Sequence, residues 1–279
     1  CSVTASFCRL YVGLGRPVLG YLALPPLHGV PRGEAQRAWY AAFRALLVDP
    51  AWAFACFNPH LSAVVAWQFG RPAPPVVRLF GWHAGASHLP RRPQEVLVAR
   101  HGKAQALQEC LLARFLEAAG DAYPWRFVQL TDLLDRTTSP GHRYNATLFF
   151  STLAVFRAAV FWPNDVTLVM FYELYTACVP LFLPKYFWLH MHGQSTLSLA
   201  EGDAAWRAPA PSDVPSPFTA RHFDATDGPF ILDVTAAAYW ARFSDFHTFP
   251  HVERFVGIPD LLHRLLAVDF HTVSSRMRV

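Results

Sequence analysis

Residues 163–184, with the sequence PNDVTLVMFYELYTACVPLFLP, carry the pattern that decides the fold. They begin with a polar loop, continue into a predicted helix over 166–177, and pass through a Val-Pro break into a short apolar strand over 180–183. The apolar run AAVFW at 158–162 comes just before and is typical of a strand buried on both faces. Strand, loop, helix and strand in this order predict a βαβ unit with parallel strands.

The same alternation extends to both sides of this unit. Short apolar runs alternate with longer segments whose apolar residues recur at helical spacing. The remaining predicted strands are 17–24, 53–57, 76–80, 95–99 and 125–130, and the remaining predicted helices are 34–48, 59–69, 103–119, 144–156, 234–243 and 259–268. The sequence therefore predicts an α/β fold built on parallel sheets.

A proline-rich loop, LPRRP at 89–93, is the strongest signal for a domain boundary. We expect an N-terminal α/β domain over 1–93 and a C-terminal α/β domain over 94–279. Residues 200–229 are rich in Pro, Ala, Asp and Ser and show no periodicity, which predicts a long loop or insertion in the second domain. Because the chain starts at Cys1 and no strand precedes 17–24, the first domain is expected to be incomplete.

The composition excludes several classes of protein. The chain has 279 residues, of which 53% are apolar and 16% charged, so it can bury a large core and is not disordered as a whole. The net charge of +4 comes without a Lys/Arg block, which argues against a nucleic-acid partner. The five cysteines form no CxxC pair, which excludes a disulfide scaffold or a zinc ribbon. The most apolar stretch, 146–163, contains Arg157 and predicts no membrane segment, and the compartment stays open.

Polar side chains follow many of the predicted strands. In open parallel sheets, ligands bind outside the carboxyl ends of the strands, where loops and helix N-termini gather. The candidates at these ends include His28, Asn58, His60, His83, Arg100, Lys103, Asn164, Asp165 and Lys185. Lys103 and Lys185 are the only two lysines of the chain, and a cation beside a helix N-terminus suits a phosphate or diphosphate. The alternative is that both lysines lie in loops by chance, because loops are where lysines usually occur.

Glu173 is an unusual residue in the predicted helix over 166–177. It is flanked by Phe171, Tyr172 and Leu174, and a carboxylate among apolar side chains needs a partner if it is buried. Fixed there, it could accept two hydrogen bonds from the vicinal hydroxyls of a ribose or another sugar. The alternative is a surface carboxylate, or one that pairs with Arg157.

Two other motifs do not predict a functional site. His190 and His192 could share a metal ion if their segment were extended. No third ligand lies at a recognisable spacing and residues 185–189 have a helical pattern, so no metal site is expected. The glycine-containing segment GLGRPVLG at 13–20 precedes a strand instead of following one, which excludes a dinucleotide-binding loop, and the GxSxG elbow of α/β-hydrolases is absent.

The string FYELYTACVPLFLP at 171–184 resembles the donor-domain motif of GT-B glycosyltransferases, in which a Glu-bearing helix runs into a short strand. EVLVAR at 95–100 resembles the first strand of such a domain, and RAAVFWPND at 157–165 resembles the strand and loop before the helix. FSDFHTFPHVERFVGIPDLLHRLL at 243–266 is similar to the tail of these proteins. The related sequences would be a group of poorly characterised algal glycosyltransferase-like proteins and, within the glycosyltransferases, the exostosin-like branch.

The resemblance implies two Rossmann-like parallel-sheet domains that face a cleft. It further implies a glycosyltransferase that moves a sugar from a nucleotide-sugar donor to a carbohydrate or glycoprotein acceptor. Because helix N-termini and cationic side chains would meet the diphosphate, no metal or other cofactor is expected. In that family the glutamate holds the nucleotide ribose, which is the role that would fall to Glu173.

The remaining candidates take their roles by position. Arg100, Lys103 and Lys185 would meet the donor diphosphate, and the loop residues Asn164 and Asp165 would complete the donor site. An inverting transfer also needs an acceptor-side base, for which His28 is the first candidate, followed by His60 and His83.

The chain departs from the family at the end of the Glu-bearing helix. The family commonly has a glycine before the x-Pro-Val strand, where it provides a left-handed helix end. Here the sequence is Ala177-Cys178-Val179-Pro180, so we expect a different turn. The rival interpretation is a non-catalytic sugar- or nucleotide-binding module, or an inactive relative on the same fold.

Overall fold

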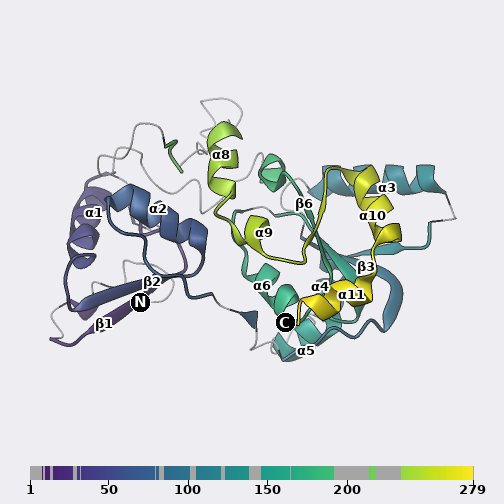
Figure 1. Ribbon diagram of the computed structural model, residues 1–279, viewed down its shortest axis with the longest axis horizontal. Coiled ribbons are helices and arrows are strands. Elements are labelled where there is room, and N and C mark those ends of the chain that lie inside the picture. Colours follow the sequence, from purple (N-terminus) through teal and green to yellow (C-terminus); the bar gives the residue numbers. More distant parts are fainter. Residues whose placement is uncertain are drawn as a thin grey trace. The chain divides into compact units, whose positions relative to one another are not determined.

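The computed structural model describes residues 8, 10–12, 15–27, 30–31, 33–78, 80–81, 85–100, 105–120, 123–137, 146–163, 165–191, 214–217 and 234–278. The chain divides into two compact units (Figure 1). Unit 1 comprises Cys1–Arg78, Asp165–Thr167 and Ser195–Thr248, and unit 2 comprises Leu79–Asn164, Leu168–Gln194 and Phe249–Val279.

Unit 2 is built on a five-stranded parallel sheet with the order β4-β3-β5-β6-β7 (Figure 1). The strands are β3 (Arg92–Arg100), β4 (Arg126–Gln129), β5 (Phe156–Phe161), β6 (Leu181–Pro184) and β7 (Glu253–Phe255). All four strand pairings are parallel. The chain first adds β4 on one side of β3 and then adds β5, β6 and β7 on the other, which is a doubly wound order. The predicted parallel α/β class is confirmed here.

Helices cover both faces of this sheet. One face packs against α3 (Gln105–Ala119) and α10 (Ile258–Ala267), which lie side by side in Figure 1. Its core contains Val96, Val160 and Phe182 from the strands, with Leu112 of α3 and Leu265 of α10. The opposite face carries α4 (Leu130–Thr137), α5 (Ala146–Leu153) and α6 (Val169–Thr176). Unit 2 therefore consists of a sheet between two helical layers.

Unit 1 starts with two βα repeats. Strand β1 (Val18–Leu22) pairs in parallel with β2 (Trp52–Cys56), and each strand is followed by its helix, α1 (Glu34–Leu46) or α2 (Pro59–Phe69). The core between them contains Leu22, Trp39, Phe43, Phe54 and Phe69, all buried. Of the strand predicted over 76–80, the described residues form a single parallel bridge, from Val76 to Cys56.

Unit 1 also contains two helices that lie between β6 and β7 in sequence, α8 (Val234–Ala241) and α9 (Asp245–Thr248). Trp240 of α8 forms a buried cluster with Val64 and Trp67 of α2. Residues expected to be an insertion in the C-terminal domain are thus assigned to unit 1, although only 214–217 of the segment 200–229 are described. The observed division also differs from the boundary expected at 89–93, because Pro93 lies inside β3.

Several elements differ from the sequence prediction. The hydrophobic pattern of the sequence did not predict four short elements, which are α4, α9, β7 and α11 (Phe270–Arg276). Helix α6 starts at Val169, three residues later than predicted for the helix over 166–177, and the helical pattern at 185–189 corresponds to a 3-10 helix, η3 (Phe187–Met191).

The four described cysteines are either disulfide-bonded or free. Cys8 is disulfide-bonded, whereas Cys56, Cys110 and Cys178 are free thiols. Among the helices described, none is long and apolar enough to cross a membrane.

Candidate functional site

The carboxyl edge of the unit 2 sheet is the first candidate site. The strand order reverses between β3 and β5, and ligands of doubly wound sheets bind outside the carboxyl ends of strands at such a reversal. Arg100, the last residue of β3, pairs with Phe161, the last residue of β5, and Lys185 directly follows β6. Arg100 and Lys185 therefore emerge at the same edge, two strand spacings or about 10 Å apart across the sheet.

The Lys185 ammonium group is exposed at this edge. Its Nζ lies 5.4 Å from the ring centroid of Tyr186, and its backbone N–H donates a hydrogen bond of 2.8 Å to the carbonyl of Phe255. Among the described carboxylates, none forms an ion pair with it. Lys185 is therefore accessible to an anion from solvent.

The structure places none of the other predicted donor-site and acceptor-side residues at this edge. Lys103, Asn164, His28 and His83 lie outside the described residues, and of Arg100 only the backbone is described. Asp165 is buried, belongs to unit 1, and accepts a hydrogen bond of 2.7 Å from the N–H of Val166. This carboxylate is thus held in its own backbone turn.

Glu173 is half-buried on α6, and the chain segment at Gly81 lies directly on it. The N–H of Gly81 donates to Oγ1 of Thr176 at 3.0 Å, and a Cβ at position 81 would lie 2.4 Å from Cα of Glu173. No side chain fits in that space, so glycine is required at 81.

The Arg157 guanidinium, named as an alternative partner for Glu173, instead lies over the rings of Trp125 and Phe270. Its distances to the two ring centroids are 5.6 and 4.7 Å.

The end of α6 corrects one expectation. Cys178 has φ 61°, in the left-handed region, and its N–H donates to the carbonyl of Tyr175 at 2.9 Å. The N–H of Val179 donates to the carbonyl of Leu174 at 3.1 Å, which completes a Schellman motif. The expectation of a different turn was wrong: the chain forms the left-handed helix end without a glycine, because these two hydrogen bonds and burial of the Cys178 side chain fix the backbone.

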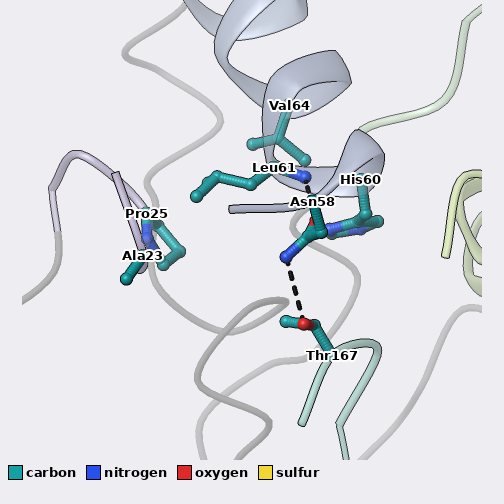
Figure 2. A pocket seen from close by; sticks show the side chains of 7 residues that line it. All are labelled: Ala23, Pro25, Asn58, His60, Leu61, Val64 and Thr167. Atoms are coloured by element: carbon teal, nitrogen blue, oxygen red, sulfur yellow. Dashed lines mark hydrogen bonds between the residues drawn. The ribbon is translucent and has the colours of Figure 1, made fainter. Parts of the chain in front are cut away.

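A second candidate site lies in unit 1, at the carboxyl ends of β1 and β2. Side chains from both strand ends, from the start of α2 and from the segment Asp165–Thr167 surround a cavity of about 10 Å³ (Figure 2). Its lining residues are Ala23, Pro25, Asn58, His60, Leu61, Val64 and Thr167. A cavity of this size holds about one water molecule.

Asn58 organises the polar side of this cavity. It is the N-cap of α2, where its Oδ1 accepts a hydrogen bond of 2.8 Å from the N–H of Leu61. Its Nδ2 donates to Oγ1 of Thr167 at 3.0 Å, shown as a dashed line in Figure 2. One amide thus fixes both the helix start and the Thr167 hydroxyl.

His60 is, with Asn58, one of two buried polar residues that line the cavity. Only 1% of its surface is exposed, and its Nε2 has no hydrogen-bond partner in the described part of the chain. Burial lowers the pKa of His60 to about 3, so the imidazole is neutral at physiological pH. A general base needs a pKa near the working pH, so the structure does not support His60 in that role.

Sequence reasoning found part of the unit 1 site. Asn58 and His60 were identified because they follow a predicted strand, but Thr167 was missed. It lies over 100 residues away from Asn58 in sequence, and only the tertiary structure brings the two together.

The described residues contain no group of three or more His, Cys, Asp or Glu side chains that could hold a metal ion. The side chain of His190 and all of His192 lie outside that description.

Comparison of the chain with protein-family models, with curated proteins and with solved structures finds no match.

Proposed function

We propose that this protein is a glycosyltransferase that moves a sugar from a nucleotide-sugar donor to a carbohydrate or glycoprotein acceptor without a metal ion. One observation carries the proposal. Glu173 lies on the helix that joins β5 to β6, and this helix passes through a left-handed end at Cys178 into β6. That is the local layout implied by the motif resemblance of residues 171–184.

The cations at the carboxyl edge of the unit 2 sheet support the donor site. In the proposal, Glu173 accepts hydrogen bonds from the ribose, and Arg100 and Lys185 face the diphosphate, with Lys103 and Asn164 as further contacts. Preorganised positive charge stabilises the negative charge that develops on the leaving diphosphate. His28 would remove the proton from an acceptor hydroxyl.

A second candidate function is a nucleotide- or sugar-binding module without transfer activity. The close approach of Gly81 to Glu173 favours a module that binds its ligand without Glu173, because the segment at 80–81 covers part of the helix surface on which the donor ribose would have to bind. In this case Glu173 would serve the packing of α6, and no product would form.

Thermal unfolding with and without nucleotide tests the donor site. UDP or GDP at millimolar concentration is expected to raise the melting temperature of the full chain, because a ligand that binds only the native state stabilises it. Glu173→Gln, which keeps the shape of the side chain but removes its charge, should lose most of that shift. The control Glu117→Gln changes an exposed glutamate of α3 and should keep the shift.

The outcomes separate the two functions. A shift in the wild type that is lost in Glu173→Gln, together with donor hydrolysis or transfer, supports the transferase. A nucleotide shift without any turnover supports the binding module. If no nucleotide raises the melting temperature, the proposed donor site is rejected.

A further inference from the structure

The cavity of unit 1 has an unusual set of lining groups for a site at the start of a helix. None of its seven lining residues is Asp, Glu, Lys or Arg, and its histidine is neutral. Four of the lining side chains, those of Ala23, Pro25, Leu61 and Val64, are apolar. A charged ligand group would lose its hydration here without gaining an opposite charge.

The start of α2 offers little to an anion. Helix N-termini bind anions through free backbone N–H groups. Pro59 has no N–H and that of Leu61 is bonded to Asn58 Oδ1, which leaves the N–H groups of Asn58 and His60 as the ones that could meet an anion. The helix start is therefore a weaker anion site than one with all its N–H groups free.

The polar atoms that remain suit a neutral group that both donates and accepts hydrogen bonds. A neutral imidazole has one nitrogen that donates and one that accepts. The Thr167 hydroxyl accepts a hydrogen bond from Asn58 Nδ2, which leaves its own hydrogen for donation. A buried polar atom without a partner is costly, and Nε2 of His60 has none among the described residues.

The cavity size limits the group further. At about 10 Å³ the cavity admits one water-sized group. A hydroxyl is neutral, has this size, and both donates and accepts. The cavity also lies at the carboxyl ends of β1 and β2, where parallel sheets bind their ligands (Figure 2).

We propose that the cavity lined by His60, Asn58 and Thr167 is a binding site for the terminal hydroxyl of a neutral alcohol or polyol. His60 and Thr167 provide the hydrogen bonds and Asn58 holds Thr167 in place, while the space of about 10 Å³ takes the hydroxyl alone and the adjoining carbon stays outside it. This site belongs to unit 1 and requires neither a nucleotide nor Glu173, so it stands or fails independently of the proposed transferase.

NMR of the full chain tests the site with ethylene glycol as the probe. Long-range ¹H–¹⁵N correlation spectra report on histidine ring nitrogens, and the His60 signal is assigned by its loss in His60→Gln. Ethylene glycol is expected to shift the His60 Nε2 resonance in a saturable manner. The matched probe 1,2-dimethoxyethane, in which both hydroxyl hydrogens are replaced by methyl groups, should give no saturable shift.

Thr167→Val removes the hydroxyl and keeps the shape of the side chain. It should weaken glycol binding about fivefold, which corresponds to the loss of one hydrogen bond of roughly 1 kcal/mol. The control Thr131→Val changes an exposed threonine of α4 in unit 2 and should leave the binding unchanged. If His60→Gln fails to fold, the His60 signal is identified instead as the histidine signal that Thr167→Val perturbs, and the wild type and Thr167→Val then suffice for the affinity comparison.

Three results would overturn the proposal. An equal shift with both probes would mean non-specific filling of an apolar space, and a shift with inorganic phosphate alone would mean an anion site. A His60 resonance that shows no saturable shift with ethylene glycol would mean that the cavity binds no hydroxyl.

Discussion

At the residue scale, Gly81 and Glu173 show how a single backbone contact constrains function. Gly81 is needed for space, because a Cβ there would collide with the backbone of α6. The contact fixes one side of Glu173 and leaves only its remaining surface for a ligand. Any role for Glu173 in ribose binding must therefore be compatible with the segment at 80–81 in place.

His60 makes the stability of the protein sensitive to acid. Burial lowers its pKa from 6.5 to about 3 in the folded state. Below pH 6.5 the unfolded chain binds a proton that the native state does not, so the free energy of unfolding falls as the pH falls from 6.5 toward 3. At pH 5 this loss is about 2 kcal/mol, from about 1.4 kcal/mol per pH unit.

His60→Gln is expected to remove this part of the pH dependence, as measured by urea unfolding at pH 7 and pH 5. The matched control His263→Gln changes an exposed histidine of α10 and should keep the wild-type dependence. An unchanged pH dependence in His60→Gln would contradict the buried, neutral state of His60.

At the element scale, the junction between α6 and β6 depends on a left-handed residue that is not glycine. A left-handed conformation costs an L-residue roughly 1–2 kcal/mol, whereas glycine adopts it freely. We therefore expect Cys178→Gly to be about 1 kcal/mol more stable than Cys178→Ala in denaturant unfolding. Both variants remove the buried thiol, so their difference isolates the backbone term. In an ordinary helix interior the order would be the reverse, with alanine favoured. Equal stability, or a more stable alanine variant, would show that residue 178 is not left-handed.

At the scale of the whole molecule, unit 1 is assembled from distant parts of the chain. Asp245 of α9 accepts hydrogen bonds from Arg78, with Nη2 to Oδ1 at 2.9 Å, and its side chain is almost fully buried. Trp240 of α8 packs against Trp67, with ring centroids 6.3 Å apart. The βα repeats of 1–78 thus depend on α8 and α9 for part of their core.

A fragment of residues 1–93 is therefore expected not to fold by itself. It would expose the Val64 and Trp67 surface and leave Arg78 without Asp245. Far-UV circular dichroism and the dispersion of amide NMR signals measure this, with the full chain as the control. A fragment that gives a well-dispersed spectrum would contradict the dependence of unit 1 on residues 234–248.

Local sequence patterns predicted most of the long elements. A helix with one buried face has apolar residues at helical spacing, and a fully buried strand is a continuous apolar run, so both can be recognised in the sequence. The βα repeats of unit 1, the strands β3 to β6 and the helices α3 and α10 follow from this. The short elements α9, β7 and α11 do not, since three to seven residues contain too little of a period.

The sequence by itself determined the class of the fold, the parallel strands and the strand ends at which Asn58, His60, Arg100 and Lys185 lie. Only the tertiary structure decided that Thr167 meets Asn58, that Gly81 covers Glu173, and that α8 and α9 complete unit 1. The physical reason is that hydrophobic periodicity reports which face of an element is buried, but not which distant segment buries it.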